Sequence, residues 1–329
     1  MAIAEPPRVF AIFNPASDRG RGAKKIPPIL ELLNRHIPGL DYAVSVRSGD
    51  EGQIAEEAIR QGFDTIVAVG GDGTLSTVAD RILATRPDQV RFGMLPGGTG
   101  NDFGRNIGIP KDSLEEAVRT LTVGRTVKVD VGRVIGAAVH EGRGGPPEAG
   151  RHFLNIVGFG FDIAAVDSAR GARLLRGALL YKTAAFQQLF RFKGFPVDLT
   201  DNEGYHRSGQ GLMIIVSNGP YFGGGYPITP RASVQDGKLH SCFIGDANPI
   251  QRLILFDRAG KGRHEGLSRV DIHTAPGFTM TFAGPVRFEI DGDVYASATG
   301  KVGVEVVPNA LQVVVPQGEL RAHPLPGTR

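Results

Sequence analysis

The chain has 329 residues, of which 41% are hydrophobic and 22% are charged, which excludes a disordered protein and leaves room for two domains. Its 37 basic and 34 acidic residues give a net charge of only +3, so composition provides no argument for a nucleic-acid partner. A single cysteine, Cys242, excludes an internal disulfide and a cysteine-rich metal site, and it favours a reducing compartment and a buried, inert thiol.

Residues 1–7 lack the basic start and the apolar centre of a signal peptide. No uninterrupted apolar run approaches the ~18 residues that cross a bilayer. We therefore expect a cytoplasmic protein, and docking on a membrane surface is compatible with that location.

Residues 8–122 alternate between short apolar runs and helix-like segments, as in βα units. Helices are predicted at 23–36, 51–61, 75–85 and 113–122, the last capped by Asp112 or Ser113, and residues 14–22 are predicted to form a loop. The predicted strands are 8–13, 42–46, 65–69 and 92–95. This alternation is typical of a doubly wound parallel sheet with helices on both faces, whose ligands bind beyond the carboxyl ends of the strands.

Two glycine-rich segments, 69–74 and 95–102, each follow a predicted strand. Glycine at a strand end lets main-chain amides approach a phosphate closely, because no Cβ is in the way. Hydroxyl, amide and carboxylate groups, the last suited to a metal or a hydroxyl, accompany these glycines: Thr74, Thr99, Asn101, Asp72 and Asp102. The two neighbouring segments predict an enzyme that handles a nucleoside triphosphate.

From residue 126 the pattern changes to short, evenly spaced strands, which are typical of a β-sandwich or barrel. The predicted strands are 127–131, 132–134, 153–157, 197–200, 211–217, 238–244, 269–274, 279–282, 286–290 and 301–307. Residues 141–150 are predicted to form a Gly/Pro loop, and two helices are predicted around 172–191 and 249–258.

The strand predicted at 311–315 is expected to return to the first domain. The domains are accordingly predicted as 1–127, completed by 309–329, and as 128–308. Together they define an α/β plus β fold.

Six motifs, in order along the chain, resemble those of the diacylglycerol kinase catalytic family, which includes bacterial lipid kinases and sphingosine kinases and is distantly related to NAD kinases. They are Phe13–Ser17, Gly70–Thr74, Pro96–Phe103, Asn218–Gly225, Asp236-Gly237 with the preceding Pro230 and Ala232, and Ile290–Asp293. The resemblance extends from about Arg8 to Val315. It implies ATP in a cleft between an α/β domain and a β-rich domain that takes a lipid.

The resemblance implies that residues of the first domain bind the nucleotide. They are Asn14, Pro15, Ala16, Ser17, Asp18, Ser48, Gly71, Asp72, Gly73, Thr74, Leu75, Ser76, Thr77, Gly98, Thr99 and Asn101. It also implies a structural Mg²⁺ site in the second domain, where the Asp236 carboxylate would combine with the main-chain carbonyls of Ser233 and Lys238.

Three aspartates receive catalytic roles by the same resemblance. Asp293 stands at the position of the family's general base, Asp291 would position that base or the metal, and Asp72 would hold magnesium or share the base role. Phosphoryl transfer suits such a set, because it needs the γ-phosphate charge neutralised by amides and Mg²⁺ and the acceptor proton taken by a carboxylate.

Two positions depart from the family pattern. The last motif usually ends Asp-Gly-Glu, whereas this chain has Asp293, which is one methylene shorter, and Ser76-Thr77 stand where the family commonly has Asn-Glu. A carboxylate misplaced by about 1 Å costs on the order of 10²-fold in rate. Either the substrate lies slightly differently, or the enzyme is slow or altered in role.

Simpler structural interpretations accompany several of these motifs. Asp291-Gly292 and Asp236-Gly237 are also common turn pairs, and Gly223–Gly225 is predicted to be a tight turn rather than a phosphate loop. The segment Arg170–Lys193 carries basic and apolar residues and no acid. It is either an amphipathic helix packed on the β domain or a basic, apolar surface for anionic lipid headgroups.

We therefore expect a kinase, dependent on ATP and Mg²⁺, that phosphorylates the hydroxyl of a membrane lipid, with diacylglycerol giving phosphatidic acid as the leading case. A sphingoid base, another glycerolipid or NAD is the alternative acceptor, and an inactive nucleotide-binding regulator is the alternative class. The expected partner is a lipid substrate at the membrane surface, and contact with the inner face of the membrane through Arg170–Lys193 is left open. No nucleic-acid partner is expected, and a homodimer is left open.

Overall fold

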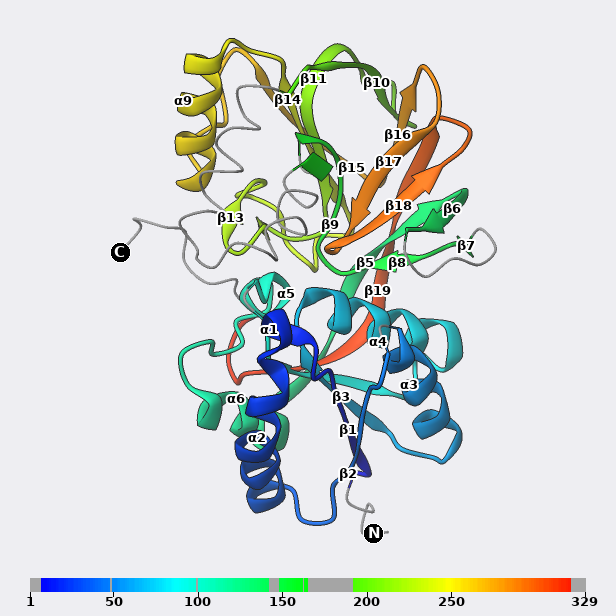
Figure 1. The fold of residues 1–329 in the computed structure, drawn as a ribbon, viewed down its shortest axis with the longest axis vertical. Helices are drawn as coiled ribbons and strands as arrows, with labels where there is room; N and C mark the ends of the chain where they lie inside the picture. The colour runs from blue at the N-terminus through cyan, green and yellow to red at the C-terminus, as the bar shows by residue number, and fades with distance from the viewer. Residues whose placement is uncertain are drawn as a thin grey trace. The chain divides into compact units, whose positions relative to one another are not determined.

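The computed structural model describes residues 7–47, 49–98, 100–141, 148–161, 163–164 and 192–320. They form two compact units: the described residues up to Val131 and from Val307 onward make up the first, and those between Gly132 and Val306 make up the second. The boundary falls within two long strands, β5 (Arg125–Ile135) and β19 (Lys301–Val315), so each of these strands contributes residues to both units (Figure 1).

The first unit is built on a parallel sheet with the strand order β2-β1-β3-β4-β19. Its other strands are β1 (Val9–Phe13), β2 (Asp41–Val44), β3 (Thr65–Gly70) and β4 (Arg91–Pro96). Strand β3 is buried at every position, as an unbroken apolar run predicts for a central strand of a parallel sheet. The doubly wound α/β prediction is confirmed.

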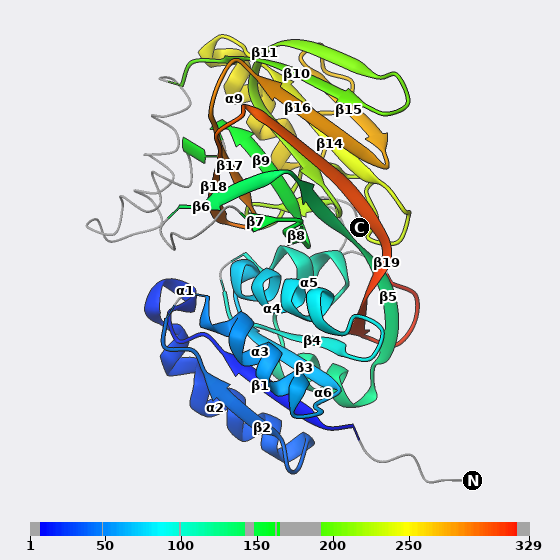
Figure 2. The same cartoon turned by 90° about the vertical axis from the view of Figure 1, so that its right-hand side faces the viewer.

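Helices cover both faces of this sheet (Figures 1 and 2). On one face α2 (Gly22–His36) packs with α6 (Leu114–Val123), and on the other α3 (Asp50–Arg60) packs with α4 (Asp72–Thr85). Ser113 caps α6, because its hydroxyl accepts a hydrogen bond of 3.2 Å from the Glu116 amide.

Two local predictions in this unit were wrong, and one short helix was not predicted. The loop predicted at 14–22 contains a short helix, α1 (Ser17–Gly20), and the second glycine-rich segment runs into another, α5 (Asp102–Asn106). Helix α4 begins at Asp72 rather than at Leu75, because the extended Gly71 starts the helix and an aspartate is favourable in a first turn.

The second unit is a β-sandwich whose two layers share β11 (His206–Ser217). The first half of β11 pairs with β10 (Phe195–Asp201), which continues through β16 (Gly277–Phe282) to β19. Its second half lies between β14 (Leu239–Gly245) and β9 (Ile156–Gly160). The register shifts between Gly211 and Met213, and such a bulge lets one strand bend and serve both layers.

The remaining strands extend these layers. Next to β9, four strands pair one after another in the order β17 (Val286–Ile290), β18 (Asp293–Ser297), β6 (Ala137–His140) and β7 (Glu148–Ala149). Strand β14 pairs with β15 (Val270–Ala275), and β5 pairs with β8 (His152–Phe153). A separate hairpin consists of β12 (Tyr221–Phe222) and β13 (Tyr226–Pro227).

The strand predictions differ from the structure mainly in continuity. Strand β5 is one element where two are predicted, β19 joins the two predicted strands 301–307 and 311–315, and β7 lies within the predicted loop 141–150. Helix α9 (Pro249–Gly260) follows the prediction and begins with a capping box formed by Asn248 and Gln251.

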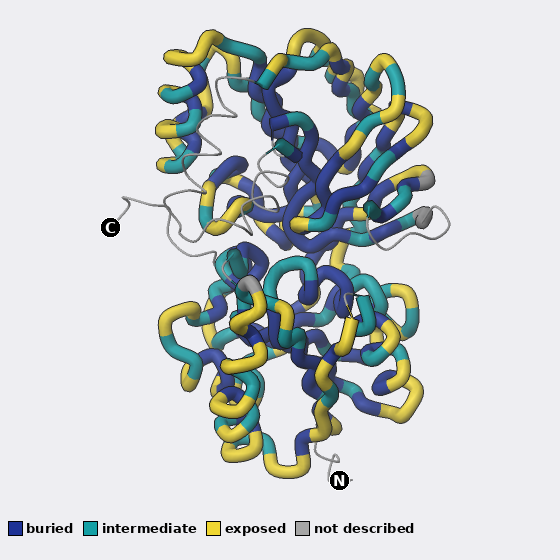
Figure 3. The backbone as a smooth tube through the Cα atoms, in the orientation of Figure 1, coloured by how far each residue is buried: buried dark blue, intermediate teal, exposed yellow. Residues whose placement is uncertain are grey.

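Buried residues run along the strands of the sandwich (Figure 3), and the apolar ones form two cores. One core lies between the layers and includes Phe159, Leu199, Met280 and Phe288. A second core lies beneath α9 and contains Cys242, whose thiol is buried as predicted, and burial raises its pKa. Within the described part of the chain, no helix combines the length and the apolar character needed to cross a membrane.

Candidate functional site

The first glycine-rich segment connects a buried strand to the amino terminus of a long helix. Strand β3 ends at Gly70, Gly71 is extended, and α4 begins at Asp72. The first turn of an α-helix presents amide groups that have no partner within the helix, and the helix dipole adds a positive potential there. The geometry of this junction is suited to phosphate, and the junction contains Gly71, Gly73 and Thr74, which are predicted to bind the nucleotide.

Asn14 ties the end of β1 to this helix. Its side-chain amide donates a hydrogen bond of 2.9 Å to the Thr74 hydroxyl, and its carbonyl oxygen accepts one of 2.9 Å from the Ala16 amide. The motif Asn14–Ser17 therefore lies beside the start of α4, as the resemblance implies. Ser17 and Asp18 follow in α1.

The two glycine-rich segments pack main chain against main chain. The Gly97 amide donates a hydrogen bond of 2.9 Å to the Gly70 carbonyl, which continues the pairing of β3 with β4. A Cβ at Gly98 would lie 2.5 Å from the Gly71 Cα, so this approach requires glycine. The side chain of Asn101 closes the second segment, because its amide donates a hydrogen bond of 2.8 Å to the Gly98 carbonyl.

Two carboxylates meet in this buried region. Asp72 Oδ1 accepts hydrogen bonds from the amides of Asp102, at 2.8 Å, and Phe103, at 3.3 Å, while Arg105 pairs with Asp102 at 2.5 Å. Burial, and then the charge of Asp102, raise the pKa of Asp72 to about 6. A divalent cation would relieve this repulsion, so the donor set of Asp72 and Asp102 fits Mg²⁺.

The protein alone does not complete such a metal site. Among the described residues no cluster of three or more His, Cys, Asp or Glu side chains could hold an ion. The further oxygen ligands that Mg²⁺ needs would come from a bound polyphosphate and water, which is how Mg²⁺ is usually held beside nucleotides.

Lys25 is a residue of this site that the sequence analysis missed. Its ammonium group lies 2.8 Å from the Asp18 carboxylate and donates a hydrogen bond of 3.3 Å to the Gly97 carbonyl. A lysine a few residues after a phosphate-binding motif is a recognisable signal, but Lys25 is the second of two adjacent lysines, and only the fold distinguishes them.

Several expected nucleotide-binding residues lie elsewhere or outside the described residues. The side chains of Leu75, Ser76 and Thr77 are buried within α4, and Thr77 faces Gly52 of α3. Ser48 and Thr99 lie outside the described residues, as do residues 170–191 of the predicted basic segment Arg170–Lys193.

In the second unit, Asp291 and Gly292 form the turn between β17 and β18. Ile290 pairs with Asp293 across the turn, and the φ angles of Asp291 and Gly292 are 47° and 93°, so the prediction of an Asp-Gly hairpin is confirmed. Asp291 is buried, and its carboxylate accepts hydrogen bonds of 2.7, 2.9 and 3.0 Å from three consecutive amides, those of Leu154, Asn155 and Ile156.

Asp293 is the first residue of β18, and its side chain is 23% exposed. The buried Asp291 holds the turn against the segment before β9, and Asp293 is thereby presented at the end of the hairpin. Of the two aspartates in this motif, the structure therefore leaves Asp293 nearer to solvent.

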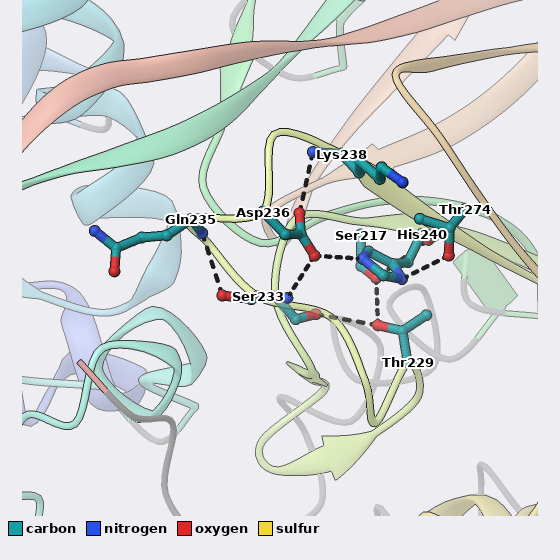
Figure 4. Close-up of polar contacts among 9 residues, drawn as sticks. Ser217, Thr229, Ser233, Gln235, Asp236, Lys238, His240 and Thr274 are labelled. Carbon is teal, nitrogen blue, oxygen red and sulfur yellow. Dashed lines mark hydrogen bonds and ion pairs between the residues drawn. The ribbon is translucent and has the colours of Figure 1, made fainter. Parts of the chain in front are cut away.

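Hydrogen bonds within the protein engage both oxygens of the Asp236 carboxylate (Figure 4). Asp236 Oδ2 accepts hydrogen bonds from His240 Nε2 at 2.8 Å and from the Ser233 amide at 3.3 Å, and Oδ1 accepts one of 3.0 Å from the Lys238 amide. The Ser233 carbonyl, an expected ligand, accepts a bond of 3.4 Å from the Asp236 amide. A cation at Oδ2 would have to displace His240, so these hydrogen bonds give no support to the predicted metal site of Asp236, Ser233 and Lys238.

His240 is itself fixed in place. Its Nδ1 accepts a hydrogen bond of 3.0 Å from the Thr274 hydroxyl, and its carbonyl accepts one of 3.3 Å from Ser217, which also contacts Thr229 at 2.5 Å (Figure 4). The histidine is buried, and it occupies the place beside the carboxylate where a cation is expected.

Gly223–Gly225 form the turn of the β12–β13 hairpin, and all three have positive φ angles, between 62° and 110°. This confirms the prediction of a tight turn, because residues other than glycine rarely adopt such angles.

Comparison with known proteins identifies two domains. Residues 8–134 match the family model described as the diacylglycerol kinase catalytic domain, and residues 155–315 match the one described as the YegS C-terminal NAD kinase beta sandwich-like domain. The chain therefore carries the catalytic domain of the diacylglycerol kinase family, followed by a YegS-type C-terminal domain.

Named relatives resemble this family member over most of its length. A protein of Klebsiella pneumoniae named "Probable lipid kinase YegS-like" is 28% identical over 302 residues, which is 90% of this chain and 94% of that protein. A Staphylococcus haemolyticus protein named "Diacylglycerol kinase" is 26% identical over 285 residues, 86% of this chain and 81% of that protein. These relationships place the chain among the lipid kinases.

A solved structure shares the fold. The crystal structure of a diacylglycerol kinase from Bacillus anthracis covers 94% of this chain and 97% of its own, with a TM-score of 0.70 and 21% identity. The family member described here therefore has the fold that its two domain matches imply.

Proposed function

We propose that this kinase transfers the γ-phosphate of ATP to the hydroxyl of diacylglycerol and so forms phosphatidic acid. The observation that carries the proposal is the phosphate site at the start of α4, where two glycine-rich segments meet beside Asp72 and Asp102. The name of the staphylococcal relative supports diacylglycerol as the acceptor.

In this proposal the first unit binds the nucleotide. The amides at the start of α4 and the segment Gly97–Asn101 receive the phosphates, and Lys25 contributes a positive charge beside them. Asp72 and Asp102 would hold Mg²⁺ together with the phosphates, and that ion supplies neutralisation of the phosphate charge when it is bound.

The second unit supplies the general base. The acceptor oxygen attacks the γ-phosphorus, the bond from that phosphorus to the β–γ bridging oxygen breaks, and ADP leaves. Asp293 takes the proton of the acceptor hydroxyl, while Asp291 positions Asp293 by holding the turn against Leu154–Ile156.

The experiment measures transfer of labelled phosphate from ATP to a panel of lipids in mixed vesicles, with Asp293→Asn as the matched variant, in which only a small residual turnover is expected. Transfer to diacylglycerol that depends on Asp293 is the expected result. Transfer to a sphingoid base, another glycerolipid or NAD alone would replace the proposed acceptor. Nucleotide binding without transfer to any acceptor would indicate a regulator.

A further inference from the structure

A buried histidine lies beside the proposed base. His140, the last residue of β6, is 8% exposed, and its Nε2 is 3.6 Å from Asp293 Oδ2. Among the described residues, neither ring nitrogen of His140 has a hydrogen-bond partner. A buried polar atom without a partner lowers stability, so its presence near a candidate site calls for a functional explanation.

The pairing of strands places these side chains on one face. His140 lies directly opposite Tyr295 in the β6–β18 pair, and Asp293 lies two residues before Tyr295. Side chains two residues apart on a strand point to the same face, so His140 and Asp293 are diagonal neighbours across the pair. The sheet itself therefore brings the imidazole to the carboxylate.

Packing fixes the orientation of the imidazole. Its ring meets the Tyr295 ring edge to face, with 4.9 Å between the centroids and an angle of 85° between the planes. Tyr295 is itself buried and lies against Phe288, with 6.1 Å between the ring centroids. The histidine is consequently held by a rigid aromatic layer rather than by hydrogen bonds.

Two acidic side chains near His140 in the described part of the chain are engaged by other partners. Glu141, the next residue, makes a two-point ion pair with Arg287 of β17, with N–O distances of 2.6 and 2.7 Å. The Asp291 carboxylate is turned to the amides of residues 154–156. Asp293 is the carboxylate that faces the imidazole.

We propose that His140 is a positioning residue that holds one oxygen of the Asp293 carboxylate, so that the other oxygen is directed at the acceptor hydroxyl. This inference rests on the proposed function, because it assigns the partner of its general base. A short movement of the Asp293 side chain closes the 3.6 Å separation to a hydrogen bond from Nε2. Such a contact orients an aspartate that is shorter than the glutamate usual at this position.

The test replaces His140 by phenylalanine, which keeps the ring packing on Tyr295 and removes both nitrogens. We expect kcat for lipid phosphorylation to fall by about 10- to 100-fold, with KM for ATP within about twofold of the original value. His140→Gln, whose amide can donate a hydrogen bond, should recover part of the loss. His273→Phe is the matched control, because His273 also contacts an aspartate of the second unit, Asp201 at 2.9 Å, and kcat should not change.

A double-mutant cycle separates positioning from a general loss of structure. In the Asp293→Asn background His140→Phe should cause no further loss, because the partner of the imidazole is already absent. An unchanged kcat in His140→Phe, or an equal loss in both backgrounds, would overturn the proposal.

A spectroscopic readout keeps the inference distinct from the proposed activity. The ¹⁵N resonance of His140 Nε2 should shift between the original protein and Asp293→Asn even if no lipid is phosphorylated. An unchanged resonance would show that the two side chains do not interact. If the resonance shifts but no lipid is phosphorylated, Asp293 is not the general base of a lipid kinase, whereas the contact between His140 and Asp293 is confirmed.

Discussion

The Asp72 carboxylate accepts a hydrogen bond of 2.8 Å from the amide of Asp102, thirty residues further along the chain. This contact brings the start of α4 and the start of α5 together, and with them the two acidic side chains. Burial and the neighbouring charge raise the pKa of Asp72 to about 6. The site is thus built at the expense of stability, as is common where charge is concentrated for function.

Asp72→Asn should therefore abolish activity and stabilise the protein. The amide keeps an oxygen for the Asp102 and Phe103 amides but carries no charge, so phosphate transfer should fall on the order of 10³-fold while Tm rises by roughly 2–4 °C above pH 7. Transfer assays and thermal unfolding of the same sample test both parts.

Asp88→Asn is the control for this change, because Asp88 is an exposed aspartate of the same unit and its side chain is 79% exposed. Asp88→Asn should change neither the rate of phosphate transfer nor Tm. Near-normal turnover in Asp72→Asn would remove Asp72 from the mechanism, and a lowered Tm would show that its charge is compensated in the fold.

Lys25→Met should weaken ATP binding. The ammonium group is held beside Gly97 by Asp18, and its removal takes away a positive charge near the phosphates. We expect KM for ATP to rise about tenfold with a smaller change in kcat. The neighbouring Lys24 is exposed, so Lys24→Met is the matched control, and equal effects in the two variants would refute a specific role for Lys25.

The sequence predicted the sheet of the first unit well because its signals are local. The apolar runs before Gly70 and Pro96 have the length of buried strands, and glycine marks the end of each. The start of α4 was misplaced because Gly71-Asp72-Gly73 resembles a loop in composition, although the extended Gly71 makes it a helix start.

Local sequence patterns could not predict the contacts between residues that lie far apart in the chain. Nothing near Asp291 indicates that its carboxylate accepts hydrogen bonds from residues 154–156, and nothing near Asp236 reveals the imidazole of His240, because their partners are defined by strand pairing and loop closure. His140 and Lys25 were missed for the same reason. Their meaning depends on the residue opposite them, not on their neighbours in the chain.

Asp291→Asn should lower the stability of the protein, whereas Asp293→Asn should affect its activity. Replacing one Asp291 oxygen by an amino group places a hydrogen-bond donor against a main-chain donor, which costs about 1–3 kcal/mol of unfolding free energy. Asp293→Asn should leave the unfolding free energy nearly unchanged and remove activity. Chemical denaturation of both variants measures this, and equal stability of the two would contradict the role of Asp291 in holding the turn.

His264 should make the second unit less stable in acid. Burial lowers the pKa of this histidine below 6.5, and its Nε2 donates a hydrogen bond of 2.8 Å to the Ile228 carbonyl. The unfolded chain binds a proton that the folded protein excludes, so the stability contributed by neutral His264 is present above about pH 6.5 and is lost as the pH falls below it.

Comparing Tm at neutral pH and at about pH 5.5 tests this dependence. His264→Gln, whose amide can donate to the same carbonyl, should lose less stability between the two pH values than the original protein. The exposed His206 supplies the control, since His206→Gln should leave the dependence unchanged. An identical loss in His264→Gln would assign the acid sensitivity to other groups.

His240→Thr should convert the Asp236 loop into one that responds to Mg²⁺. In the original protein the His240 imidazole is hydrogen-bonded to the Asp236 carboxylate, so the stability of the second unit should be the same in Mg²⁺ and in EDTA. Removing the ring exposes a carboxylate oxygen beside the Ser233 and Lys238 main chain, where a cation can enter. The variant should be less stable in EDTA and should regain stability in Mg²⁺. The measurement belongs in the Asp72→Asn background, which removes the response expected from the first unit. A Mg²⁺-dependent Tm before His240 is changed would mean that a cation displaces the imidazole, and the structural metal implied by the family resemblance would then be restored.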